Sequence, residues 1–194
     1  MRVVIFGGTG LLGSSIRNNL EKKKISCFVS SLTKKSDFKS NLLSKKKIFN
    51  FLKKIKPHVI INCSGETDVN LCNKNFDEAY KSNVKTIKNI VFATEKLKKS
   101  TYLIHISTDQ VYDSIKPSEE DDVSISNNYG ASKFLGEIEA RRLNNSLVLR
   151  TNFFGKSNSI NRLSYTDYII SNLSKKKKYT YHRMYILILY IFII

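Results

Sequence analysis

The sequence predicts an α/β fold in which a parallel β-sheet is doubly wound, with helices on both of its faces. Short apolar segments rich in β-branched residues, typical of buried parallel strands, alternate with longer segments of helical periodicity. A glycine-rich segment joins the first expected strand to the first expected helix, and the chain contains no internal repeat. Such alternation is typical of βαβ units, which build parallel sheets.

Each expected element follows from its residue pattern. The strands are short apolar runs, at residues 2–6, 25–30, 59–62, 102–107 and 146–151. The helices have apolar residues three or four positions apart, at residues 11–23, 48–56, 76–98, 129–142 and 165–173. Pro57 ends the second helix, and the inner face of the third consists of Ala79, Val84, Ile87 and Ile90.

Composition limits the classes of function. The chain has 194 residues, which suits one α/β domain, and its 41% hydrophobic content excludes wholesale disorder. The net charge of +17 invites a nucleic-acid interpretation, but lysine far outnumbers arginine. Because lysine, asparagine and isoleucine have A/T-rich codons, base composition explains this skew. We therefore expect no nucleic-acid partner.

Cysteine and histidine usage predicts neither disulfides nor a metal site. The three cysteines form no CxxC pair and the three histidines are scattered, which suits a reducing cytosol. No secretory signal is visible, and the apolar run at 185–194 is shorter than the roughly 20 residues that span a bilayer. We expect a cytoplasmic protein with no membrane partner.

The first glycine-rich segment has the spacing of a dinucleotide-binding loop. Gly7 to Gly13 fits GxGxxG, leaves an apolar strand and opens a helix, as in Rossmann-type domains. Glycine permits the tight turn, the approach of the backbone to a pyrophosphate and close helix packing, while the helix N-terminus attracts the phosphates. A glycine-rich turn without a ligand is the alternative. The expected cofactor contacts are Gly7, Thr9, Gly10, Leu11, Leu12 and Gly13.

The end of the second strand favours NADP(H) over NAD(H), although NAD(H) stays open. An acidic residue normally follows this strand to hold the ribose 2′-hydroxyl of NAD. Here the segment contains Ser30, Ser31, Lys34 and Lys35 instead. Hydroxyls and ammonium groups suit a 2′-phosphate better, unless the two lysines only reflect the general excess of lysine.

Two segments match the pattern YxxxK, and their contexts separate them. Tyr129 and Lys133 lie four residues apart at the start of an expected helix, hence on one face. An ammonium and a cationic nicotinamide would both lower the pKa of a phenol and make it a proton shuttle. Tyr112 and Lys116 lie in a segment broken by Pro117, so we expect no site there.

Thr108 follows an expected strand, at the edge of a parallel sheet where ligands bind. Its hydroxyl can donate to a substrate carbonyl while Tyr129 supplies the proton. A strand-end cap is the alternative role for Thr108.

Together these segments resemble the extended short-chain dehydrogenase/reductases, and among them the dTDP-4-dehydrorhamnose reductase group. The resemblance covers residues 1–155 and rests on segments that occur in the family's order. These are GGTGLLG at 7–13, SDFKSN at 36–41, KPHVIINCSGETDV at 56–69, SNV at 82–84, HISTDQVYD at 105–113, YGASKFLGE at 129–137 and LRTNFFG at 149–155.

The resemblance implies roles for individual residues. Thr108, Tyr129 and Lys133 would form a catalytic triad for hydride transfer between NADP(H) and a keto group on a nucleotide-linked sugar. The other implied positions are Asp37 and Phe38 by the adenine, Cys63, Ser64 and Gly65 along the cofactor, Thr67 on the substrate side and Asn83 at the carboxyl edge of the sheet. Glu66, Asp68 and Asn70 depart from the group's usual residues, which leaves the particular sugar open.

Family members of this kind continue beyond the length of this chain, so we expect most of the substrate-binding part to be missing. Residues 1–160 form the expected cofactor-binding domain, and residues 161–194 a remnant with an apolar tail. We attribute the tail after the lysine run 175–178 to a frameshift, with a genuine buried strand or helix as the alternative.

Three functions follow from this sequence. The first is a reductase, whole or truncated, that takes a nucleotide-sugar substrate. The second is a non-catalytic regulatory module that binds a nucleotide, and the third a membrane-attached variant that uses the apolar tail. A homodimer stays open as an assembly.

Overall fold

The computed structural model describes residues 1–32, 36–114, 117–153, 155 and 164–174. Its six strands form one sheet with the order β3-β2-β1-β4-β5-β6, and every neighbouring pair is parallel. The carboxyl ends of all six strands therefore lie along one edge. The strands are β1 (Arg2–Phe6), β2 (Ser26–Ser31), β3 (Phe38–Lys39), β4 (Val59–Asn62), β5 (Tyr102–Ser107) and β6 (Ser146–Arg150).

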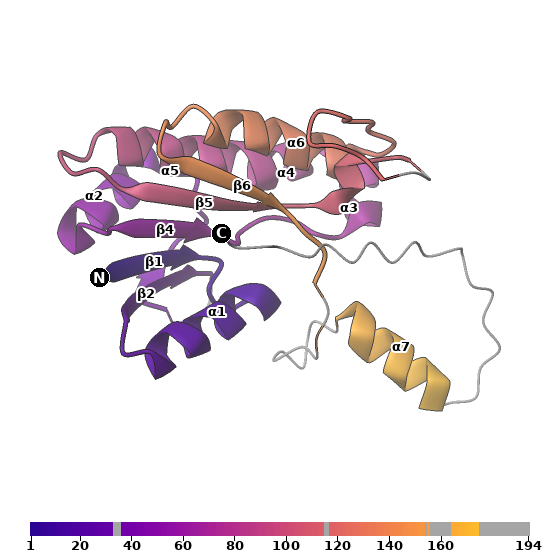
Figure 1. The fold of residues 1–194 in the computed structure, drawn as a ribbon, viewed down its shortest axis with the longest axis horizontal. Helices are drawn as coiled ribbons and strands as arrows, with labels where there is room; N and C mark the ends of the chain where they lie inside the picture. The colour runs from indigo at the N-terminus through magenta and orange to yellow at the C-terminus, as the bar shows by residue number, and fades with distance from the viewer. Residues whose placement is uncertain (33–35, 115–116, 154, 156–163, 175–194) are drawn as a thin grey trace.

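Helices cover both faces of the sheet, as the sequence predicts. Helix α1 lies on one face, and α2, α5 and α6 lie side by side on the other (Figure 1). The helices are α1 (Leu11–Lys22), α2 (Lys45–Ile55), α3 (Val69–Lys74), α4 (Phe76–Tyr80), α5 (Thr86–Glu95), α6 (Asn128–Ala140) and α7 (Tyr165–Ser174). A π-helical turn η1 (Lys81–Lys85) joins α4 to α5, and a 3-10 turn η2 (Asp109–Val111) follows β5.

The core lies between the central strands and the layer formed by α2, α5 and α6. Strand β1 is central, so its residues from Val3 to Phe6 are almost completely buried. Ile60 and Leu103 from the neighbouring strands are also inaccessible to solvent. The expected inner face of the third helix is confirmed, because all four of its apolar residues are buried.

The segment expected as one helix at 76–98 is divided. Asn75 caps α4 by accepting a hydrogen bond from the Glu78 N–H at 3.2 Å. The hydroxyl of Thr86 donates to the Ser82 carbonyl, a back-bond that commonly bends helices. Two further elements were not expected from the sequence: the two-residue strand β3 and the short helix α3, which Asp68 caps at the Leu71 N–H.

Several sequence expectations fall outside the described residues. These are the roles of Lys34 and Lys35, the second lysine match at Lys116, and the apolar tail within 175–194. Across the described ranges, no helix is both long and apolar enough to cross a membrane. The same ranges hold no group of three or more His, Cys, Asp or Glu side chains that could bind a metal ion.

Candidate functional site

The glycine loop begins where β1 ends, and its backbone is fixed by the two neighbouring strands. Gly7 has φ +77°, a left-handed conformation that favours glycine. The N–H groups of Gly7 and Gly8 donate to the Ser30 carbonyl of β2 at 2.9 and 3.2 Å. On the other side, a Cβ on Gly7 would lie 2.7 Å from the backbone of Cys63 and Ser64. The loop therefore fits between β2 and the turn that follows β4.

Gly13 and Gly10 differ in how much room there is for a side chain. A Cβ on Gly13 would lie 2.3 Å from the Gly7 carbonyl oxygen, so α1 can approach the loop only without a side chain there. A Cβ on Gly10 would meet only that oxygen, at 3.3 Å, and Gly10 and Thr9 are exposed. Gly10 begins α1 without any side-chain cap, which leaves the first-turn N–H groups open to an anion.

The end of β2 contributes buried hydroxyl groups beside this loop. Ser30 and Ser31 are both buried, and the Ser30 hydroxyl makes no hydrogen bond with any described residue. Asp37 accepts a hydrogen bond from the Val29 N–H at 2.7 Å, and the Phe38 ring stacks on Phe51 of α2 with centroids 4.5 Å apart. The open helix end and the buried Ser30 hydroxyl fit a dinucleotide.

The turn after β4 is held by a buried pair of polar side chains. Asn62 accepts hydrogen bonds from the N–H and the hydroxyl of Ser64, at 3.2 and 2.5 Å. The Asn62 amide lies 3.0 Å from Nδ1 of His105 in β5. Burial lowers the pKa of His105 well below its ordinary value, and the Lys133 ammonium lowers it further. A neutral imidazole therefore accepts from Asn62 and fixes the turn.

Asn83, from the π-helical turn, connects this turn to α6. Its Oδ1 accepts from the Glu66 N–H at 2.8 Å. Its Nδ2 donates to the Glu66 carbonyl at 3.1 Å and to the Ser132 hydroxyl at 2.8 Å. The Glu66 carboxylate accepts from the N–H groups of Thr67 and Asp68, at 2.8 and 2.9 Å. The acidic residues that depart from the family pattern thus have local structural contacts.

Thr108 and Tyr129 lie together at the end of β5, both buried. The Thr108 hydroxyl caps η2 by accepting from the Gln110 N–H at 3.2 Å, so the strand-end cap is also present. Burial raises the pKa of Tyr129, a hydrogen bond with Thr108 opposes that rise, and the negative charge of Asp109 adds to it. Tyr129 is accordingly a protonated phenol at neutral pH.

Lys133 lies one turn after Tyr129 on α6, and its ammonium donates to the Ile106 carbonyl at 2.6 Å. Burial lowers the pKa of Lys133 to about 8, although the charges of Glu137 and Cys63 oppose this shift. Cys63 is itself a thiol, because burial raises its pKa to about 12. Lys133 is not among the groups that shift the pKa of Tyr129 here, so the expected lowering by an ammonium together with a bound nicotinamide stays a prediction. The ammonium is directed at the Ile106 carbonyl, and burial dominates at the phenol.

The comparisons with known proteins agree with this arrangement. The family model for the RmlD substrate binding domain matches residues 1–177. The chain belongs to this RmlD family. A crystal structure of dTDP-4-dehydrorhamnose reductase from Bacillus anthracis str. Ames, in complex with NADP, is 27% identical with a TM-score of 0.75. That similarity covers 91% of this chain and 61% of the other.

Two curated relatives of this RmlD-family chain have names that point to different functions. Methionine adenosyltransferase 2 subunit beta from Rattus norvegicus is 32% identical over 141 residues, 70% of this chain and 41% of the relative. The spore coat polysaccharide biosynthesis protein SpsK from Bacillus subtilis (strain 168) is 31% identical over 157 residues, 78% of this chain and 53% of the relative. The chain thus spans about half the length of these relatives or less.

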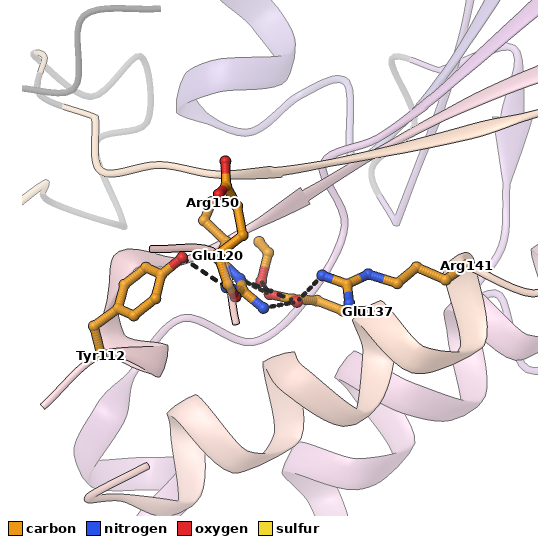
Figure 2. Close-up of polar contacts among 6 residues, drawn as sticks. Tyr112, Glu120, Glu137, Arg141 and Arg150 are labelled. Atoms are coloured by element: carbon orange, nitrogen blue, oxygen red, sulfur yellow. Dashed lines mark hydrogen bonds and ion pairs between the residues drawn. The ribbon is translucent and has the colours of Figure 1, made fainter. Parts of the chain in front are cut away.

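One group of residues in this RmlD-family site was not expected from the sequence. Glu137 is completely buried and accepts hydrogen bonds from Arg150 at 2.7 Å and from Ser107 at 2.5 Å (Figure 2). Arg150 also donates to the Tyr112 hydroxyl at 2.6 Å, so Tyr112 of the second YxxxK match has a structural partner. Two signals were available in the sequence. Glu137 follows Lys133 by four residues on the same helical face, and Glu137 and Arg150 both lie in segments that carry the family resemblance.

Proposed function

We propose that this chain supplies the cofactor-binding and catalytic groups of an NADP-dependent reductase acting on a keto group of a nucleotide-linked sugar. The observation that carries the proposal is a convergence at one sheet edge. The open N-terminus of α1, the turn after β4 and the buried pair of Tyr129 and Lys133 all lie where parallel strands end. Ligands of open α/β sheets bind at that edge, where the strand order reverses beside β1.

The glycine loop and its neighbours would hold the dinucleotide. The first-turn N–H groups after Gly10 would receive the pyrophosphate, and Ser30 and Ser31 would lie toward the adenosine ribose. Asp37 and Phe38 stay predicted neighbours of the adenine, and Cys63, Ser64 and Gly65 line the path toward Lys133. The bound nicotinamide supplies the hydride.

Three side chains would handle the substrate carbonyl. Tyr129, kept protonated by burial, can donate a proton to the carbonyl oxygen as negative charge develops there. The Thr108 hydroxyl can donate a second hydrogen bond to the same oxygen. Lys133 carries its charge below about pH 8 and can hold ribose hydroxyls or restore the phenol proton. Thr67, exposed beyond the turn, would face the sugar.

A binding module without turnover is the second candidate function. It is favoured by the similarity to a protein named as a subunit beta of methionine adenosyltransferase 2. It is also favoured by the Lys133 contact, because an ammonium held by the Ile106 carbonyl does little for the phenol. In that case the chain would bind the dinucleotide and act through a partner protein.

Turnover separates the two candidates. Consumption of NADPH is measured with dTDP-4-dehydrorhamnose, the substrate that the Bacillus anthracis relative's name implies. A chimera is used in which residues 1–155 continue into the C-terminal part of that reductase. We expect oxidation of NADPH that depends on the sugar nucleotide. A chimera that binds NADPH and consumes none of it would instead support the binding module.

Calorimetric titration of the chain itself tests the cofactor preference. We expect tighter binding of NADP than of NAD, because the described end of β2 presents serines where an acidic side chain would hold the NAD ribose. Equal affinities, or tighter binding of NAD, would contradict the proposed preference for NADP but not the proposed binding of a nicotinamide dinucleotide.

A further inference from the structure

We propose that Glu137 is a positioning residue for this site: its buried side chain ties the end of β5, directly before Thr108, to helix α6 one turn after Lys133. The proposal rests on the proposed function in taking Thr108, Tyr129 and Lys133 as the reacting groups.

The stripe of α6 that faces β5 carries three functional side chains at four-residue intervals, Tyr129, Lys133 and Glu137. Each meets the end of β5. The Tyr129 hydroxyl lies near Thr108, Lys133 donates to the Ile106 carbonyl, and Glu137 accepts from the Ser107 hydroxyl. Residues 106–108 thus each face one side chain of this α6 stripe. Its two charged side chains, Lys133 and Glu137, are both buried.

Glu137 also fixes the elements around this strip. Arg150, at the end of β6, donates through Nε and Nη2 to the carboxylate at 3.0 and 2.7 Å. The same guanidinium donates through Nη1 to the Tyr112 hydroxyl and to the Glu120 carbonyl, both at 2.6 Å. Figure 2 shows Arg150 between Tyr112 and Glu137, with its guanidinium joined to both. The segment after Thr108 is therefore linked to α6 through Arg150 and the Glu137 carboxylate, in addition to the direct packing of η2 on α6.

Charge gives Glu137 a second effect, on Lys133. The groups that act on the pKa of Lys133 are burial, which lowers it, and the charges of Glu137 and Cys63, which raise it. His105 of β5 faces the same ammonium and is neutral, because burial and Lys133 both lower its pKa. Cys63 is a thiol at neutral pH, so Glu137 is the one carboxylate among these groups that compensates the buried ammonium.

The test is the titration of Lys133, followed by NMR of ¹³Cε-labelled lysine and assigned with Lys133→Arg. In the wild type we expect Lys133 to titrate near pH 8, apart from the exposed lysines. In Glu137→Gln we expect the titration to move to lower pH by roughly one unit, a tenfold loss of proton affinity. A purely structural loosening would admit water and move it to higher pH, so the sign of the shift separates the two roles.

Glu139→Gln is the matched control. It makes the same change on the same helix, but Glu139 pairs with Lys88 of α5 and with Arg142, at 3.4 and 3.3 Å. We expect no shift of Lys133 in this variant. If Glu137→Gln does not fold because Arg150 is left buried without its carboxylate, Glu137→Gln/Arg150→Gln removes both charges. Arg150 is not among the groups that act on Lys133, so the same downward shift is expected.

The Lys133 titration tests the inference about Glu137, and NADPH oxidation by the wild-type chimera tests the proposed function, so the two can fail separately. An unchanged or raised Lys133 titration in a folded Glu137 variant would overturn the inference, even if the wild-type chimera oxidises NADPH. A downward shift with no turnover in the wild-type chimera would support the inference for Lys133 and overturn the proposed function. If the inference and the proposed function both hold, the rate of NADPH oxidation by the Glu137→Gln chimera falls at least tenfold at pH 8. It falls less at pH 6.5, where Lys133 stays charged.

Discussion

Tyr112 and Tyr129 begin the same five-residue pattern, YxxxK, in the sequence but lie in different surroundings in the structure. The hydroxyl of Tyr112 accepts a hydrogen bond from Arg150, whose guanidinium also lies 5.0 Å from the Tyr112 ring centroid. Tyr129 packs against Cys72 and Ala79, with Thr108 at its hydroxyl. The Tyr112 phenol is hydrogen-bonded to the Arg150 guanidinium, whereas the protonated Tyr129 phenol lies at the sheet edge, where the proposed function makes it the proton donor. The local motif does not distinguish these roles, whereas the elements that pack around each tyrosine do.

The largest expected effect of this difference is on turnover. In the chimera, Tyr129→Phe should lower the rate of NADPH oxidation by roughly 10²- to 10⁴-fold, because the proton donor is lost. Tyr112→Phe should leave the rate close to that of the parent, since its hydroxyl contacts Arg150 and no reacting group is assigned there. Rates are measured at saturating NADPH. Equal losses in the two variants would contradict the assignment of Tyr129.

Lys133 sharpens the comparison through the pH dependence of stability. Its pKa in the folded chain is about 8, below that of an unfolded lysine, so the unfolded state holds more protons between about pH 8 and 10. The free energy of unfolding of the wild type should therefore rise across that window relative to Lys133→Met, by about 3 kcal/mol. Urea unfolding of both proteins at several pH values measures this difference. A constant difference from pH 7 to 10 would show that Lys133 is not buried as an ammonium.

A smaller effect is expected in the free energy of unfolding at neutral pH. Here Tyr112→Phe should have the larger effect of the two variants, the reverse of their order in turnover. Tyr112→Phe removes a hydrogen bond from a guanidinium and should cost about 2 kcal/mol in the free energy of unfolding. Tyr129→Phe removes a bond to the neutral Thr108 hydroxyl and should cost about 1 kcal/mol. Urea unfolding at pH 7 decides between them. A larger loss for Tyr129→Phe would mean that its hydroxyl has a structural role.

The sequence was sufficient for most of the sheet and for the glycine loop. Strands such as β1 and β4 are continuous apolar runs, and buried parallel strands have that composition wherever they occur. The glycine loop was also predictable, because close backbone contacts at Gly7 and Gly13 require the residue type itself.

What the sequence could not provide depends on contacts between distant segments. Strand β3 has two residues and exists because Ser30 and Ser31 pair with it. Glu137 and Arg150 come from a helix and a strand, and no local pattern assigns them to one another. The effect of burial on the pKa of Tyr129 also depends on neighbouring elements, which the spacing to Lys133 does not reveal.

Binding of NADPH to the open end of α1 is the central claim, and Gly10→Ala tests it most directly. A Cβ at Gly10 would make one tight contact, 3.3 Å from the Gly7 carbonyl oxygen, and would add a methyl group at the exposed position where α1 begins and a pyrophosphate would approach. Titration of NADPH into wild type and Gly10→Ala is followed by fluorescence, with melting temperatures as the control for folding. The account predicts saturable binding by the wild type and at least tenfold weaker binding by Gly10→Ala at an unchanged melting temperature. Equal affinities in the two proteins, or no binding by the wild type, would contradict it.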